Sequence, residues 1–154
     1  MLTNEALHEA VLALLAPITR DRYDYTGDAV KVAQISAQGL DLHVGHVGKV
    51  ALGADGTAAP YMALAPHPRG DRHTRLSGGA SVGTYDITLT VAAGSPRGAR
   101  AALDLVMPRF ARTYLVPGRT GLLVPYFDVI DLIEDEDVAP TRWYVPLRWR
   151  TTVH

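Results

Sequence analysis

Cysteine is missing from this chain of 154 residues. Disulfide bonds and thiol catalysis are therefore excluded, and a zinc site would need histidine and carboxylate ligands. No apolar run approaches the roughly 20 residues that a membrane-spanning helix requires. The N-terminal segment 1–21 has no basic start, and Glu5, His8 and Glu9 interrupt its apolar residues. We therefore expect no secretory signal and no membrane partner.

An excess of either charge is also missing, because 15 basic residues face 16 acidic ones. General binding to nucleic acid or to a membrane surface needs a basic excess, so neither is expected. The sequence contains no GxSxG, no P-loop, no dinucleotide fingerprint and no HExxH. We expect a protein that is not an enzyme, has no cofactor and forms a single domain over 1–154.

Two amphipathic helices are predicted. In the first, Thr3 or Asn4 caps the start and Pro17 ends the helix. In the second, Ser95 is the N-cap, Pro96 takes the first helical position, and Pro108 kinks or ends the helix. Apolar residues recur at helical spacing in both segments: Leu7, Ala10, Val11, Leu14, Leu15 and Ile18, then Ala99, Ala102, Leu103, Val106 and Phe110.

Strands are predicted around 42–51, 61–65, 85–91 and 122–133, and from residue 142 to the C-terminus. Pro125 and Pro146 suggest edge or bulged strands, because proline cannot donate to a ladder. Residues 20–58 are the least informative. The order of elements predicts an α+β fold, an antiparallel sheet of about four to five strands with two helices packed on one face.

A long polar loop, about 67–81, joins two of these strands. It is longer than a compact domain needs, and such loops are functional or disordered. Arg69, Arg72 and Arg75 supply donors suited to carboxylates on a partner. Two interpretations stay open: a mobile solvent loop, or an assembly arm that orders on docking.

Four histidines raise the alternative of a small metal enzyme. His43 and His46 lie in a strand-like segment, where residues three apart point to opposite faces, so we expect two surface or rim histidines. His67 and His73 flank Asp71, but no third ligand stands at a recognised spacing. One further cluster is a solvated turn by default, or a surface for a cation or a partner: Glu134, Asp135, Glu136 and Asp137.

Three segments occur in a familiar order: "PYMALAPHP" before the loop, "YDITLTVAAGSPRGARAALDLVMPRF" after it, and "RWYVPLRWRTTV" near the C-terminus. This pattern resembles the tail terminator proteins of long-tailed, siphovirus-type bacteriophages, especially those infecting actinobacteria. The resemblance covers Tyr61 to about Phe110 and, more weakly, the last strand. At 92–94 the chain has Ala-Ala-Gly, where the family often has Cys-Val-Gly.

The resemblance implies a structural virion protein that assembles in the host cytoplasm and lies at the head-proximal end of the tail. Its partners would be further copies in a homohexameric ring, the major tail tube protein and a head-closure or connector neck protein. Genomic DNA would pass through the ring without sequence-specific binding. Candidates for the two different patches of such a ring are the arm (Arg69, Arg72, Arg75) and the acidic turn 134–137, whose opposite charges suit pairing between subunits or with the tube. In the alternative, the acidic turn lines the channel, where negative charge keeps DNA from sticking. Alternatives are a head-tail connector or head-closure protein of similar fold, and a stand-alone ligand-binding module.

Overall fold

A computed structural model describes residues 2–25, 29–35, 38–65, 74–75, 81–126 and 131–154. It contains two α-helices, α1 (Asn4–Leu15) and α2 (Pro96–Phe110), and a short 3-10 helix, Ala16–Ile18. The strands are β1 (Thr19–Tyr25), β2 (Ala29–Gln34), β3 (Leu40–Val44), β4 (Tyr61–Leu64), β5 (Thr74–Arg75), β6 (Ser81–Ala93), β7 (Val124–Pro125), β8 (Ile133–Asp135) and β9 (Arg142–Val153).

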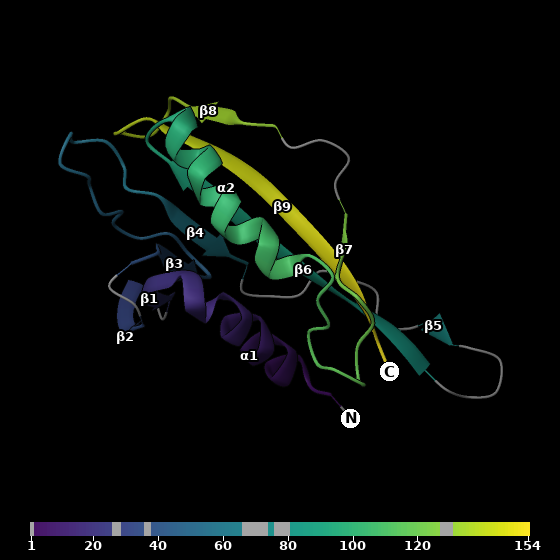
Figure 1. Cartoon of the computed structure of the whole chain (residues 1–154). Helices are drawn as coiled ribbons and strands as arrows, with labels where there is room; N and C mark the ends of the chain where they lie inside the picture. The colour runs from purple at the N-terminus through teal and green to yellow at the C-terminus, as the bar shows by residue number, and fades with distance from the viewer. Residues whose placement is uncertain (1, 26–28, 36–37, 66–73, 76–80, 127–130) are drawn as a thin grey trace.

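All nine strands join one sheet, along the path β2-β1-β3-β4-β6-β9-β7, with β5 beside β6 and β8 beside β9. The long antiparallel pair β6–β9 forms its spine (Figure 1). The α+β class is as predicted, but the sheet is larger than the four to five strands expected. It is also not purely antiparallel, because β3 runs parallel to both β1 and β4.

Two of the additional strands, β1 and β2, come from 19–34, where no strand was expected, and β3 takes the place of the strand expected around 42–51. β1 reads Thr-Arg-Asp-Arg-Tyr-Asp-Tyr, without the apolar alternation that marks a strand. Its charges are instead compensated by ion pairs: Arg20 donates to Asp41 on β3, and Arg22 to Asp24 on β1 itself. Contacts such as that between Arg20 and Asp41, which join different strands, hold this half of the sheet together. A local sequence pattern does not reveal such contacts.

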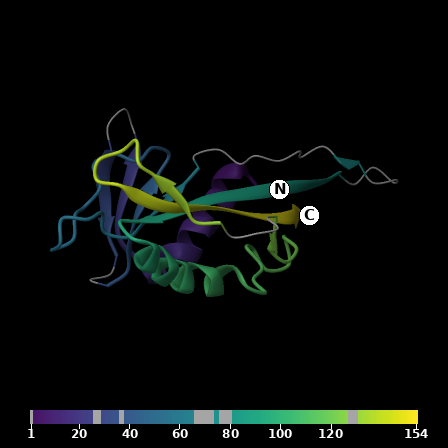
Figure 2. The ribbon, with the colours of Figure 1, turned by 90° about the horizontal axis from the view of Figure 1, so that it is seen from above.

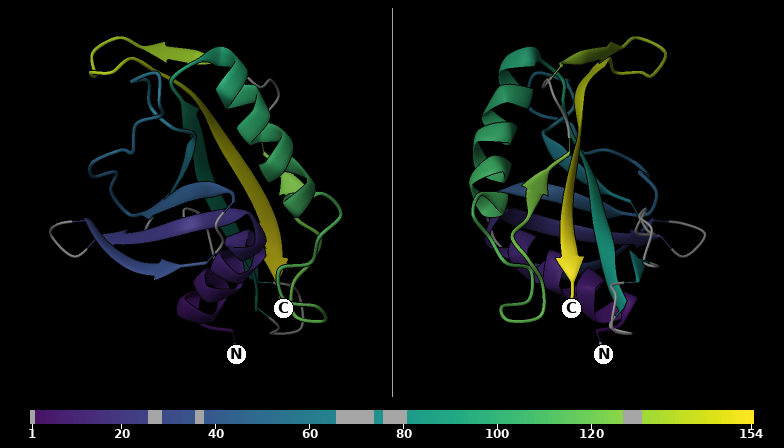
Figure 3. Two further views of the ribbon diagram at one scale, coloured as in Figure 1. Left: turned by 60° about the vertical axis from the view of Figure 1, so that its left-hand side comes forward. Right: turned by 90° about the vertical axis from the view of Figure 1, so that its right-hand side faces the viewer.

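Both helices pack against one apolar cluster of the sheet, as predicted. Figure 2 shows α2 along one side of β6 and β9. Leu7 and Val11 of α1, Val106 of α2 and Leu89 of β6 belong to one apolar cluster and are almost fully buried. The predicted stripe of α2 is identical to its buried set. In the left view of Figure 3, β1 to β3 run across the page while β6 and β9 run down it, so the sheet is strongly twisted.

The helix ends follow the predicted caps. The Thr3 hydroxyl accepts from the Ala6 N–H, and the Ser95 hydroxyl accepts from the Gly98 N–H, both at 3.0 Å. Pro108 does not end α2, which continues to Phe110. A proline this close to the C-terminus of a helix disturbs only the last turn.

The predicted strand over 122–133 is instead two short strands, β7 and β8, that pair with different parts of β9. Pro125 lies in a terminal strand, as expected.

Pro146 does not mark an edge strand, because β9 pairs with β6 on one side and with β7 and β8 on the other. It stands opposite Thr90, between the stretches of β9 that pair with β8 and with β7. The Arg148 carbonyl accepts from the Tyr126 N–H on the side of β9 that faces β7. Because residues two apart point their backbone groups to the same side, the Pro146 nitrogen also faces away from β6, and the β6 ladder loses no donor.

Candidate assembly surfaces

Of the predicted arm, the structure describes Thr74–Arg75 and Ser81, which lie at the start of β6. β5 pairs with β6 through Thr74 opposite Val82 and Arg75 opposite Ser81, beyond the end of the β4 pairing. Figure 2 shows this short hairpin at the tip of the long ribbon, well away from both helices. Arg75 is therefore placed on the tip by its backbone. The predicted residues Arg69 and Arg72, together with His67, Asp71 and His73, lie outside the described residues.

The acidic turn lies at the opposite end of the same ribbon. Glu134 and Asp135 belong to β8, which pairs with Trp143 and Arg142 at the start of β9. Glu136 and Asp137 continue into a turn, which the Asp137 N–H closes by donating to Asp135 Oδ1 at 3.2 Å. Glu134 is exposed, as are Glu136 and Asp137. The structure thus brings the four acidic residues together on one short projection.

The two predicted patches are separated by the length of the spine. β5 contacts Ser81 and Val82, whereas β8 lies beside the part of β9 that pairs with Ala92 and Ala93. At about 3.3 Å per residue, this stretch of β6 is about 35 Å long. Figure 1 shows β5 and β8 at opposite ends of the molecule. The tip at Thr74–Arg75 and the acidic turn therefore do not meet within one chain.

The face of the sheet away from the helices is polar around β6 and β9. Arg150 donates to both carboxylate oxygens of buried Asp86, at 2.7 and 2.9 Å. The hydrogen bonds to Asp86 raise the pKa of Arg150. Arg150 also lies over the ring of Tyr126, 4.3 Å from its centroid, and Arg148 lies over the same ring. The sequence pattern did not predict the contact of Tyr126 with these two arginines.

His43 is not the surface or rim histidine that was expected. It is 1% exposed, and no hydrogen bond reaches either ring nitrogen from the described residues. Its ring stacks on Tyr23 of β1, 5.0 Å away, and meets the edge of Tyr61 of β4. Burial lowers the pKa of His43; the nearby Asp41 opposes this shift and Arg142 adds to it. His46 is exposed, as expected, so the two histidines do not converge.

We expect the burial of His43 to make stability pH-dependent. Because its pKa is lower in the folded chain than in the unfolded chain, the unfolded state takes up the proton first. The free energy of unfolding should therefore be highest above about pH 6.5, the ordinary pKa of histidine. It should fall as the pH drops from there through the pKa that His43 has in the folded chain. Urea denaturation between pH 7.5 and 5 measures this slope. His43→Phe should flatten it and His46→Gln should retain it; equal slopes in all three proteins would contradict the account.

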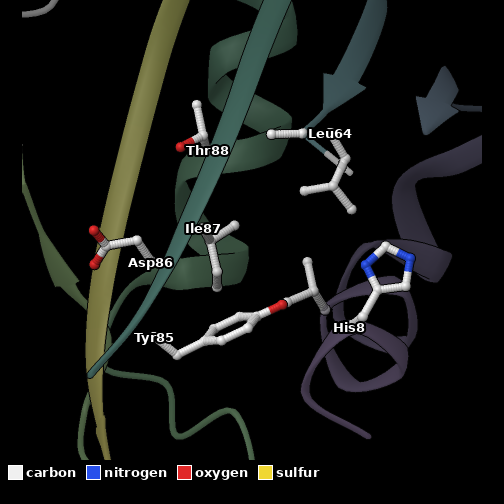
Figure 4. A pocket seen from close by; sticks show the side chains of 8 residues that line it. His8, Leu64, Tyr85, Asp86, Ile87 and Thr88 are labelled. Carbon is white, nitrogen blue, oxygen red and sulfur yellow. The ribbon is translucent and has the colours of Figure 1, made fainter. Parts of the chain in front are cut away.

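A small pocket opens where α1 crosses the lower half of β6. Its cavity volume is only about 10 Å³, and it is lined by residues of α1, of 64–65 and of 85–88. Figure 4 shows the His8 ring and the Tyr85 side chain approaching each other across it. Asp86, which also lines it, is already held by Arg150. The pocket is too small to hold a drug-sized ligand, for which 300–1,000 Å³ is typical.

No group of three or more histidine, cysteine or acidic side chains is arranged to hold a metal within the described part of the chain. None of the described helices is long and apolar enough to cross a membrane. Among the described residues, the surface offers the acidic turn and several exposed apolar side chains. In comparisons with known proteins, no family model and no curated protein matches this chain.

Proposed function

We propose that this chain is a bacteriophage tail terminator, a structural virion protein that forms a ring on the end of the tail tube. In this role it stops polymerisation of the tube and offers the surface to which the head and neck attach. The proposal starts from the resemblance of three sequence segments to that family. The fold and the distribution of charge support it in two ways.

The three resembling segments are neighbours in space. They form β4, the unit β6–α2, and β9, and these three strands are consecutive in the sheet. Phe110 of α2 stacks on Trp149 of β9 at a centroid distance of 3.9 Å, which ties the last two segments together. The resemblance is therefore carried by one packed unit, rather than by unrelated surface stretches.

The observation that carries the proposal is the chemical difference between the two ends of the β6–β9 spine. One end carries β5 with the backbone of Arg75, one of the three arginines of the predicted arm, and the other end carries the acidic turn of Glu134 to Asp137. A terminator lies between two different partners, the tube and the neck, and so needs unlike surfaces that face in opposite directions. Opposite charge at the two ends would give each partner its own contact and exclude the wrong one.

The test is to add the purified chain to tail tubes that lack it and to examine the tubes by negative-stain electron microscopy. A terminator is expected to appear as extra density at one end of each tube, and to prevent elongation when further tube protein is added. Tubes without the chain serve as the control. Binding to the neck complex but not to tube ends would favour the head-tail connector or head-closure alternative. Binding to neither would overturn the proposal.

A further inference from the structure

Four side chains from four strands form a row across the sheet, here called the ring row. It consists of Tyr23 of β1, His43 of β3, Tyr61 of β4 and Arg142 of β9. The His43 ring stacks on Tyr23 at a centroid distance of 5.0 Å and meets the edge of Tyr61 at 5.6 Å. The guanidinium carbon of Arg142 lies 5.7 Å from the centroid of the Tyr61 ring, and its Nη1 donates to the Tyr61 hydroxyl at 3.2 Å.

The ring row lies on the face of the sheet away from the helices. Leu42 and Met62 alternate with His43 and Tyr61, and both belong to the apolar cluster in which the helices pack. His43 and Tyr61 therefore point to the other face. There, Tyr61 belongs to a second buried cluster with Val50, which comes from the connection between β3 and β4.

The row also spans a short ladder. The described pairing of β3 with β4 covers 41–44 and 61–64, and it is parallel, a pairing slightly less stable per residue than the antiparallel one. The β6–β9 ladder is antiparallel and covers 83–93 and 143–153. Local opening occurs where few backbone hydrogen bonds and contacts hold two segments together. The β3–β4 junction is therefore a weak joint between the first strands and the β6–β9 spine.

His43 has the central place in the ring row, and its surroundings suit only the neutral imidazole. It is 1% exposed, and neither ring nitrogen has a hydrogen-bond partner among the described residues. An imidazolium at this place would lose its hydration without gaining an acceptor for its two N–H groups. Burial accordingly lowers the pKa of His43; Asp41 opposes the shift and Arg142 adds to it.

The charged neighbours do not compensate a proton on His43. Asp41 faces it from β3, but both carboxylate oxygens already accept from Arg20 of β1, at 3.0 and 2.9 Å. Arg142 comes from β9 and has the same sign of charge as an imidazolium. The two tyrosines of the row present uncharged rings to it. The titratable side chains of the connection between β3 and β4 are exposed: His46, Lys49 and Asp55.

We propose that His43 is an acid-operated latch, whose protonation in mild acid opens the β3–β4 junction while the β6–β9 spine stays folded. Opening brings the imidazolium into water, which the closed sheet denies it. The spine has its own contacts, Phe110 on Trp149 and Arg150 with Asp86, and neither pair includes a member of the ring row. The pH dependence of global unfolding requires only that unfolding expose His43, whereas the latch exposes it in a chain that is otherwise folded.

Thiol labelling measures this opening without background, because the chain has no cysteine of its own. Val44→Cys places a buried thiol on β3, and the matched Val145→Cys places one on β9. Both are labelled with a dithiodipyridine reagent at pH 7.5 and pH 5, and each rate is divided by that of a short cysteine peptide at the same pH. The corrected rate of Val44→Cys should rise about ten- to thirtyfold in acid, since about thirtyfold is the limit for one proton with an ordinary pKa of about 6.5. That of Val145→Cys should stay unchanged.

Two further variants test whether His43 causes the opening. His43→Phe in the Val44→Cys background should abolish the rise, and His46→Gln should retain it. Equal acceleration of both thiols would indicate global unfolding and would overturn the inference. So would a constant rate at Val44→Cys, or a rise that persists without His43.

Nuclear magnetic resonance of the unmodified chain gives a check that needs no variant. The His43 ring signals should titrate with a midpoint below about pH 6.5, and the amide signals of 41–44 and 61–64 should change with the same midpoint. The amide signals of 147–151, in the spine, should not follow it. Junction amides that ignore the His43 titration, or spine amides that share it, would contradict the latch. Neither readout involves tail tubes, so the latch and the terminator function can each fail without the other.

Discussion

Replacing Trp149 with alanine is expected to lower the free energy of unfolding by about 3–5 kcal/mol, the range for removing a large buried aromatic side chain. Trp149 is 1% exposed and lies in the middle of β9. Its ring stacks on Phe110 at an interplanar angle of 10°, so it joins the end of α2 to the sheet. Because domains of this kind are stable by only about 5–15 kcal/mol, the loss is a large share of the total.

Urea denaturation followed by circular dichroism measures this loss. Trp143→Ala is the matched control, because Trp143 lies on the same strand but is only partly buried. We expect the control to lose clearly less stability than Trp149→Ala. If both variants lost the same amount, or if Trp149→Ala lost less than about 1 kcal/mol, stacking between α2 and β9 would not be central to the core.

Reversing charge on the arm is expected to block assembly without unfolding the protein. In Arg72→Glu/Arg75→Glu, two cations of the predicted arm become anions. The backbone of Arg75 lies at the end of the β6–β9 spine that is opposite to the acidic turn. If each lost ion pair is worth about 1.4 kcal/mol, the contact with the partner weakens about a hundredfold. Phage titre and the yield of complete tails measure the effect, with melting temperature as the check on folding.

The matched control is Arg97→Glu/Arg100→Glu, which reverses two exposed charges on α2. It should leave the titre close to that of the unmodified phage. If the arm contacts the acidic turn of another copy, Glu134→Arg/Asp137→Arg should rescue the arm variant. If the arm contacts the tube instead, no rescue is expected. A normal titre in the arm variant would exclude the arm from assembly.

The helices and the spine were predictable because their signals are local. The apolar stripe of α2 and the alternation of Val145, Leu147 and Trp149 record burial on one face, and the structure buries these residues. Ser95 followed by Pro96 marks the start of α2, because the Ser95 cap and the fixed φ of Pro96 both act within the first turn. These features do not depend on what the rest of the chain does.

The first part of the sheet was not predictable, because its stability comes from distant partners. Asp41 is almost fully buried, and Arg20 on another strand compensates its charge. His43 is enclosed by Tyr23 and Tyr61, from two further strands. A polar residue that becomes buried in this way has no local pattern that separates it from a surface residue.

The candidate surfaces were partly predictable. The acidic residues form a turn at the end of β8, as their composition indicated, and Arg75 lies in a short strand beside β6; a role of either in assembly stays a prediction. The exposure of apolar side chains at 122–126 was missed. Pro125 indicated an edge or bulged strand over 122–133, but not which side chains there are exposed. The structure shows that Leu122, Val124 and Tyr126 are exposed.

The most direct test of the terminator proposal is electron microscopy of particles from a phage in which the gene for this chain is disrupted. The proposal predicts overlong tails without heads beside filled heads, because tube growth has lost its stop. Tails of normal length that fail to join heads would contradict it and would place the protein on the connector side of the neck. Normal infectious particles would also contradict it and remove the protein from the neck altogether.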